Sequence, residues 1–564
     1  MNNKRQPEII GILLLTLLNH PLWAEILPDR DLAPLDRPTL PEFEEESPAQ
    51  VLPDLPIIPP QKQQRLSSKI TIFVKQFKFK GNHVFSDEKL TEIVQNYQNK
   101  FINYEQLQEA KNNITRFYYE EGYVNSGAII QDQPVIDGII TITIIEGKLS
   151  QVEVIGNERL PPSYIQKRLK GEKNTVLNSK ELQKRLLILQ QNPLLEYIQA
   201  ELGPGIKPGE GILKIKLKEA RPYQLQFNFD NHRSPSVGAY RGEIEGWHRN
   251  TGFFLADSLY LRYGLTEGLN DYTMEYGLPI NHYDTTLSFK IERSDSEVIE
   301  SPFNQLDIES EADTYAISLS HSLQSFKKHN QSLNLALKLE KTTSKTFLLG
   351  KPFSFSPGVI NGESTVSIIS FSQDWLNRSR DHSLAVRSTL NFGIDALGST
   401  INNDGSPDSK FFSWLGQFQY VKQFLKKQKI IFRTDFQWAD QSLLPLKKLS
   451  IGGASTVRGY RENLITGDNA LISSLEWRIP VRQLPISKVL EIALFADYGR
   501  AWQADSSTLD LEKIYSIGLG LHWNPHKKLH TQLYWGHALR DIPKQGDKNL
   551  QDNGIHFEVS FRIM

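Results

Sequence analysis

The chain of 564 residues contains no cysteine, which excludes disulfide bonds and cysteine-ligated metal sites but assigns no compartment. Its formal net charge is only −1, so no global field points to nucleic acid or to an acidic substrate. It also lacks any apolar run of about 18 residues or more, which excludes transmembrane helices. A transmembrane β-barrel stays open, because its strands alternate lipid-facing apolar and lumen-facing polar residues and are polar on average.

The short motifs of common enzymes are missing as well. We find no Gly-x-Ser-x-Gly elbow, no phosphate-binding glycine loop and no His-Glu-x-x-His. His526 and His530 are four residues apart, but Pro525 and the strand-like flanks argue against a helix that would align both on a metal. The sequence therefore predicts no catalytic residue, no metal site and no cofactor, and we expect a protein that is not an enzyme.

The N-terminus has the pattern of an export signal. Lys4 and Arg5 precede an apolar core over residues 9–18, and Ala24 supplies a small residue for cleavage. This arrangement predicts a secretory signal peptide over residues 1–24 and export across the inner membrane of a Gram-negative-type cell. The alternative is a short amphipathic helix of the mature protein. Residues 25–68 are acidic and rich in proline, which predicts an extended periplasmic linker with room for only a short helix.

Two stretches of similar pattern follow, over residues 69–147 and 148–220. Each opens with a short strand-like segment that ends in Gly-Asn, at Gly81-Asn82 and at Gly156-Asn157, and the two glycines are 75 residues apart. A segment with helical spacing and then an alternating, strand-like segment come after each Gly-Asn. The sequence therefore predicts the same α+β unit twice.

From residue 221 to residue 564 the pattern changes to alternation of apolar and polar residues. Clear examples run from Tyr223 to Phe229, from Leu333 to Leu339 and from Tyr515 to Trp523, with turn signals such as Asp404-Gly405 between strands. A membrane strand takes about 10 residues plus a turn, so about sixteen antiparallel strands fit, and about fourteen or eighteen would fit too. Alternation alone does not separate a membrane barrel from a soluble sheet, but the export signal and the lack of helical patterning favour the barrel.

One stretch in this half combines glycines with a charged residue between strand-like neighbours. It begins at Gly452-Gly453 and ends in the tetrad Val457-Arg458-Gly459-Tyr460. Glycine permits backbone conformations that other residues avoid, which indicates a shaped loop. Further along, Phe495-Ala496-Asp497-Tyr498-Gly499 closes an apolar segment. Because an arginine held away from bulk water needs a counter-charge, Asp497 is the candidate partner of Arg458.

The tetrad resembles the characteristic loop motif of the two-partner secretion transporters, outer-membrane β-barrels that export haemolysins, adhesins and contact-dependent inhibition toxins. Phe495, Asp497 and Gly499 resemble the Phe-x-Asp-x-Gly motif on a nearby barrel strand of that family. The α+β repeat resembles a pair of POTRA domains, periplasmic modules that bind unfolded polypeptide. The resemblance covers nearly all of the chain after the linker.

This resemblance implies α+β periplasmic POTRA domains at 69–147 and 148–220, followed by an all-β transmembrane barrel of about 16 antiparallel strands over 221–564. It implies that a loop around residues 445–470 folds into the barrel, where the planar guanidinium of Arg458 makes two hydrogen bonds to Asp497. The alternative is an ordinary extracellular loop and an unrelated aspartate. Family members carry a helix that plugs the barrel, whereas the prolines of this linker leave room for only a short one.

The implied function is an outer-membrane pore that receives an unfolded exoprotein in the periplasm and translocates it to the cell surface. Its partners would be that exoprotein, membrane lipid and, during biogenesis, periplasmic chaperones and the barrel assembly machinery, but no nucleic acid. Many bacterial barrels end on an aromatic residue, whereas this chain ends on Met564. Two alternatives stay open, an assembly factor that inserts barrel proteins and a passive porin or surface receptor. The client could be a haemolysin, an adhesin, a haem-binding protein or an inhibition toxin.

Overall fold

The computed structural model describes residues 37–38, 43, 70–170, 175–323, 331–481, 490–505, 512–543 and 546–563. The predicted signal peptide, and the linker apart from residues 37, 38 and 43, lie outside the described residues. The chain forms two compact units, one over Glu46–Arg221 and one over Pro222–Met564 together with Met1–Glu45. No described helix is long and apolar enough to cross a membrane.

The unit over Glu46–Arg221 contains two modules with one topology. In the first module the shared elements are β2 (Gln76–Lys80), α2 (Asp87–Val94), α3 (Tyr104–Glu120), β4 (Gly127–Ile129) and β5 (Ile139–Ile145). In the second they are β6 (Lys148–Ile155), α4 (Pro162–Leu169), α5 (Ser179–Gln190), β7 (Leu195–Pro204) and β8 (Glu210–Glu219). In both sheets the last strand is central, parallel to the first strand and antiparallel to the other. The repeat in the sequence is therefore a repeat in three dimensions.

A small extra sheet and a buried helix complete the first module. Strands β1 (Thr71–Val74) and β3 (Lys100–Asn103) pair antiparallel just ahead of α3. Helix α3 begins at a capping box in which Asn103 and Gln106 exchange side-chain hydrogen bonds with each other's backbone N–H. Its residues Leu107, Ala110 and Ile114 recur at helical spacing and are buried. They form one core with the inward residues of β2 and β5.

The two Gly-Asn turns require glycine for the same two reasons. Gly81 and Gly156 have φ of +84° and +90°, which side-chain-bearing residues rarely adopt. A Cβ atom on Gly81 would lie 2.5 Å from the carbonyl oxygen of Ile144, and one on Gly156 would lie 2.3 Å from that of Leu217. Each turn therefore packs backbone against the central strand of its own sheet.

The turns are also held by equivalent side chains. The amide of Asn82 donates to the carbonyl of Phe85 at 3.0 Å, and that of Asn157 donates to the carbonyl of Leu160 at 2.9 Å. One glutamate at the end of each central strand accepts backbone N–H groups of the turn, Glu146 in the first module and Glu219 in the second.

The glutamate of the second module is held as a carboxylate. Burial raises the pKa of the Glu219 carboxyl, but the backbone N–H donors of residues 158–160 and the side chain of Arg159 outweigh it and hold the pKa below its usual range. A strand-end glutamate thus fastens each turn, a role that the sequence pattern does not reveal.

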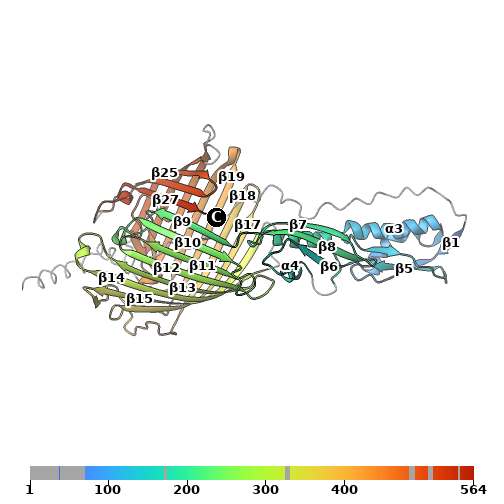
Figure 1. The fold of residues 1–564 in the computed structure, drawn as a ribbon, viewed down its shortest axis with the longest axis horizontal. Helices are drawn as coiled ribbons and strands as arrows, with labels where there is room; N and C mark the ends of the chain where they lie inside the picture. The colour runs from blue at the N-terminus through green and yellow to red at the C-terminus, as the bar shows by residue number, and fades with distance from the viewer. Residues whose placement is uncertain are drawn as a thin grey trace, which may run out of the picture. The chain divides into compact units, whose positions relative to one another are not determined.

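The second unit is a closed antiparallel barrel of sixteen long strands among the described residues, which confirms the predicted number. The first eight are β9 (Tyr223–Asp230), β10 (Arg241–Arg249), β11 (Ser258–Leu265), β12 (Leu269–Pro279), β13 (Thr286–Glu297), β14 (Ile308–Ser322), β15 (Gln331–Leu348) and β17 (Glu363–Arg378). The other eight are β18 (His382–Ile394), β19 (Phe412–Phe424), β20 (Gln428–Ala439), β23 (Asn469–Pro480), β24 (Leu490–Trp502), β25 (Glu512–His526), β26 (Leu529–Ala538) and β27 (Ile555–Arg562). The last strand, β27, lies beside the first, β9, and pairs with it (Figure 1).

Alternation along the strands separates two chemically different barrel faces. On β24, Ala493, Phe495 and Asp497 are buried, whereas Leu494 and Ala496 between them are exposed. The exposed face of the barrel carries many large apolar side chains, including Ile317 on β14. Such a belt would associate in water and suits lipid, while the buried polar residues face the lumen.

One long connection returns into the barrel. Antiparallel neighbours alternate in direction and β20 is the eleventh long strand, so the connection after β20 lies at the end of the barrel opposite the start of β9. This connection, residues 440–468, is called the in-folded loop below. It contains the hairpin β21 (Leu449–Ile451) and β22 (Ile465–Gly467), which packs on β23 and β24.

We predict that Gly156→Ala destabilises the second module by at least about 1–2 kcal/mol, the cost of a left-handed backbone for a residue with a Cβ. Hydrogen exchange of the intact protein should show faster exchange in β6 and β8. Gly203→Ala is the matched control, because a Cβ on Gly203 meets only one backbone oxygen, at 4.0 Å. Equal exchange in the two variants would contradict the role assigned to the turn.

Candidate functional site

The in-folded loop is held against the barrel wall by an apolar cluster. Its buried residues Leu449, Ile451, Val457 and Ile465 pack on inward side chains of β23, β24 and β25. The tight turn at Gly452 and Gly453 has φ of +109° and +99°. The backbone N–H of Gly452 donates to Thr456 Oγ1, and Glu462 Oε1 accepts the N–H of Ala454 at 2.6 Å. The glycine-rich stretch is therefore a shaped loop with internal bonds.

Arg458 lies at the centre of the site. Its Nε and Nη2 donate to the two oxygens of Asp497, each at 2.8 Å, and its backbone N–H donates to the same carboxylate at 3.0 Å. Nη1 donates to Glu476 on β23, and Nη2 also donates to Ser474 Oγ at 3.0 Å. The Arg458 side chain is 5% exposed and that of Asp497 is 0% exposed. The guanidinium is thus bound by two carboxylates out of contact with bulk water.

Two aromatic rings cover the faces of this guanidinium. Its central carbon lies 3.7 Å from the centroid of Phe495 and 4.5 Å from that of Tyr534 on β26. A cation over a ring face is attracted by the ring quadrupole, and more strongly so when it is desolvated. The Tyr534 hydroxyl in turn donates to Glu476 at 3.2 Å. Phe495 and Asp497 therefore act on the same group from one strand, two residues apart.

The remaining motif residues are sites of close backbone approach. Gly459 has φ +93°, and a Cβ there would lie 2.8 Å from the carbonyl carbon of Gly536 on β26. A Cβ on Gly499 would lie 2.6 Å from Val457 Cγ2. These glycines let the loop touch the wall on two strands, β24 and β26.

The last residue of the tetrad bonds to backbone groups of the wall and the next loop. The Tyr460 hydroxyl lies 3.0 Å from the carbonyl of Tyr515 on β25 and 3.1 Å from that of Arg540. Its ring belongs to the apolar cluster under the loop. Every residue of the tetrad thus has its own contact with the barrel.

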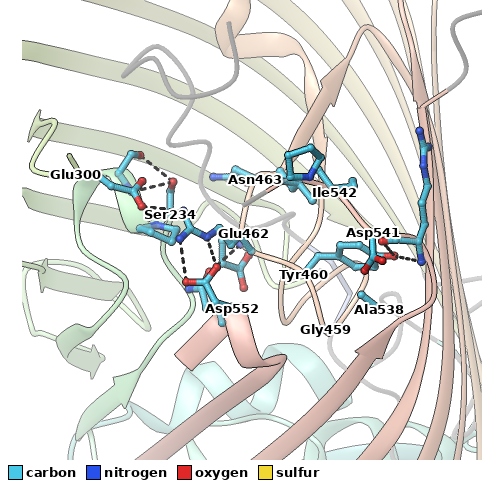
Figure 2. A pocket seen from close by; sticks show the side chains of 17 residues that line it. Ser234, Glu300, Gly459, Tyr460, Glu462, Asn463, Ala538, Asp541, Ile542 and Asp552 are labelled. Carbon is cyan, nitrogen blue, oxygen red and sulfur yellow. Dashed lines mark hydrogen bonds and ion pairs between the residues drawn. The ribbon is translucent and has the colours of Figure 1, made fainter. Parts of the chain in front are cut away.

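A second arginine joins the in-folded loop to two outer loops. Arg461 Nη1 donates to Glu300, in the β13–β14 connection, at 2.7 Å, and Nε donates to Asp552, in the β26–β27 connection, at 2.7 Å. These groups border a cavity of about 130 Å³, and Figure 2 shows Glu300, Glu462 and Asp552 grouped on one side of it.

Part of the N-terminal segment lies inside the barrel. Arg37 donates from Nε to Asp435 on β20 at 2.7 Å and also donates to the carbonyl of Ser455 in the loop. The side chain of Gln419 on β19 donates to the carbonyl of Pro38. A cavity of about 320 Å³ lies beside Arg37 and Arg458. The linker residues 37 and 38 therefore touch both the wall and the loop.

The structure brings Arg458 and Asp497 together, and it adds partners that sequence reasoning missed. The strand register sets Ser474 opposite Asp497 and Glu476 opposite Phe495, while Tyr534 comes from a third strand. An acidic residue at a lumen position of an alternating strand was the available signal for Glu476. The pairing that makes it a ligand of Arg458 is not encoded locally.

The two spaced histidines of the sequence lie on a hairpin. His526 ends β25 and His530 belongs to β26, and the hydrogen bonds of their rings are with neighbouring groups of that hairpin. In the part of the chain that the structure describes, no group of three or more His, Cys, Asp or Glu side chains is arranged to hold a metal ion.

Tandem α+β modules, a closed sixteen-stranded barrel with a lipid-facing belt and a loop held in its lumen define an outer-membrane transporter of the POTRA and β-barrel class. The family model of the haemolysin secretion/activation proteins ShlB/FhaC/HecB matches residues 209–523, and that of the ShlB-type POTRA domain matches residues 72–147. The chain belongs to this family.

Known relatives agree with this assignment. The chain is 21% identical over 454 residues to the outer membrane transporter CdiB of Dickeya dadantii (strain 3937), with 78% of each chain covered. It is 22% identical over 496 residues to the heme/hemopexin transporter protein HuxB of Haemophilus influenzae (strain 86-028NP), with 82% of each covered. The solved structure of CdiB from Escherichia coli has the same fold, with a TM-score of 0.65 at 18% identity over 100% of this chain and 99% of that one.

These findings confirm the predicted class of protein. The chain is an outer-membrane two-partner secretion transporter, which moves a partner exoprotein to the cell surface and holds POTRA domains in the periplasm. The predicted fold class, α+β modules followed by an all-β barrel, is confirmed as well.

We predict that Gly459→Ala displaces the in-folded loop, because the new Cβ collides with the backbone of Gly536. Protease cleavage of the loop in intact outer membranes should increase several-fold. Gly405→Ala is the control, since Gly405 also has a positive φ, +83°, but no atom lies within 4 Å of its Cβ position. Equal cleavage of the loop in the two variants would show that the contact does not hold it.

Proposed function

We propose that this transporter exports one dedicated exoprotein as an unfolded chain, and that the in-folded loop, held by Arg458, is required for the passage. The observation that carries this proposal is the buried contact of Arg458 with Asp497 and Glu476, which fixes the loop in the lumen through which the client travels. Folding of the client at the cell surface makes its return unfavourable, so transport needs no ATP at this membrane.

The two modules supply the means of capture. Among the described residues, the outer strands of both three-stranded sheets pair in a sheet with the central strand only, and β4 and β7 are two of these edge strands. An extended polypeptide can pair with such an edge through its backbone, which tolerates many sequences. The ten-residue strand β7 offers the longer edge. We therefore assign client capture to the modules and passage to the barrel.

We define the client by its chemistry alone, as an unfolded polypeptide, because the name of HuxB refers to heme and hemopexin whereas that of CdiB refers to no cargo. We infer that the chain acts as a transporter without catalytic activity. We also infer that periplasmic chaperones deliver it and that the barrel assembly machinery inserts it, as they would any barrel that is exported unfolded.

We predict that Arg458→Ala leaves the barrel inserted but strongly reduces secretion of the exoprotein. Removing the guanidinium leaves the buried carboxylate of Asp497 without a cation, whereas Glu476 keeps its ion pair with Arg478. The cost of about 3–5 kcal/mol falls on the loop, since the strand ladder is unchanged. Heat-modifiable mobility reports the folded barrel, and immunoblotting of the medium reports secretion. Arg293→Ala, which removes an exposed arginine of β13, should behave as wild type. Normal secretion by the Arg458 variant would end the proposed role of the loop.

Deleting the gene in its host should remove one large protein from the medium or the cell surface and leave other outer-membrane barrels at their normal level. Quantitative proteomics of the medium and of the outer membrane measures both. A general fall of barrel proteins would instead indicate an assembly factor. Unchanged surface and medium proteins, with altered uptake of solutes, would indicate a porin.

A further inference from the structure

The in-folded loop has a second anchor, on a different wall of the barrel. Lys447 ends a short 3-10 turn of the loop, Pro445–Lys447, and its Nζ lies 2.7 Å from Glu340 Oε1 on β15. Counted along the order of long strands, β15 is eight strands from β26 in either direction, and β26 carries the Tyr534 ring that covers Arg458. The loop therefore spans the lumen from one wall to the opposite one.

The two anchors differ in burial and in the number of contacts that they make. Arg458 is 5% exposed, uses its whole guanidinium and is covered by two rings. Lys447 makes one hydrogen bond to Glu340, and the side chains of the two residues are 19% and 15% exposed. Water therefore reaches this pair more readily than it reaches Arg458 and Asp497, and it competes for the hydrogen bond. We expect the Lys447 anchor to separate more often.

The two anchors also differ in the carboxylate that would remain on the wall if the loop detached. Lys338 lies two residues from Glu340 on the same strand, and its Nζ is 2.7 Å from Glu340 Oε2. When Lys447 withdraws, Glu340 keeps a cation, so no buried carboxylate is left unpaired. Withdrawal of Arg458 would strip the cation from Asp497, which is 0% exposed, and burial of an unpaired charge is costly. The loop can therefore detach from β15 at a low cost in free energy, whereas detachment from β24 is costly.

The outer contact of the loop differs in the carboxylate that opening would leave behind. Arg461 bridges to Glu300 beside β14, but it also holds Asp552 on the side of β27. If the Glu300 contact opens, Arg461 retains a carboxylate partner within the group that stays with the loop. Opening this contact takes the Arg461 guanidinium away from Glu300, whose side chain is 6% exposed, so the Glu300 contact resists release more than the Lys447 contact does.

We propose that the Lys447–Glu340 ion pair is a latch, which closes the lumen by holding the loop to β15 and opens for the client while Arg458 stays bound to β23 and β24. The loop then moves as a flap hinged on the β23–β26 side. The inference rests on the proposed function for its export assay only, because the latch also controls passage of ions through the empty barrel.

The first test compares two lysines that bind the same carboxylate. Lys447→Gln and Lys338→Gln each remove one positive charge beside Glu340, but only the first breaks a contact between loop and wall. In planar bilayers we expect purified Lys447→Gln protein to open several-fold more often than wild type. Lys338→Gln should stay at the wild-type frequency, and heat-modifiable mobility will show that both barrels are folded. Equal opening frequencies in the two variants overturn the latch.

The second test locks the latch in cells. The chain has no native cysteine, so Lys447→Cys with Glu340→Cys can be joined specifically by a bis-maleimide that contains a reducible disulfide. We expect export to stop on crosslinking and to return on reduction. Lys338→Cys with Glu340→Cys places the same adduct on the wall alone and should export before and after treatment. Export through the crosslinked Lys447 variant overturns the latch, whereas a wild-type chain that exports nothing would refute the proposed function instead.

Discussion

A guanidinium inside a membrane barrel has to be neutralised where it lies, and Arg458 is neutralised by carboxylates from two adjacent wall strands. Asp497 and Glu476 come from β24 and β23, and the register of these strands alone brings them to one point. The contact exists only while the sheet is closed in that register and while the loop is turned inward. Barrel pairing, loop conformation and the buried ion cluster therefore depend on one another.

A buried ion cluster of this kind fixes the position of the loop and adds little to the free energy of folding. Desolvating charges costs free energy that their attraction roughly recovers, so an apolar replacement of the whole cluster could be equally stable. An apolar loop would slide along an apolar wall, however. A guanidinium with its donors committed to Asp497, Glu476 and Ser474 has one place to lie. The aromatic faces of Phe495 and Tyr534 exclude water from that place and strengthen the same bonds.

The features of this structure that depend on neighbouring residues in the chain can be predicted from the sequence. Alternation predicts strands and their inward faces, and the spacing Phe495, Asp497, Gly499 places three side-chain positions on one side of a strand because the period of a strand is two. The need for a counter-charge makes Asp497 a candidate partner of the loop arginine, and the resemblance of the two motifs to those of the family predicts their contact. Glu476 and Tyr534 do not follow, since their approach depends on register and on barrel closure, which no window of residues specifies. The contact of Glu340 with Lys447 cannot be predicted for the same reason, because the two residues are 107 positions apart in the chain.

The repeat shows the same division between local and non-local information. Gly81 and Gly156 stand out because a turn with positive φ leaves a mark in the sequence. Glu146 and Glu219 bind those turns from about sixty residues away and show no recognisable sequence pattern. Their role becomes visible only in the tertiary structure, where the central strand lies next to the turn.

The placement of Arg37 and Pro38 has a consequence for the space inside the barrel. These residues touch β19 and β20 in the lumen, although they precede the first wall strand, which begins at Tyr223, by more than 180 positions in the sequence. The wall is therefore built around a segment of its own chain. A client that passes through the lumen must therefore share it with residues 37 and 38 or displace them.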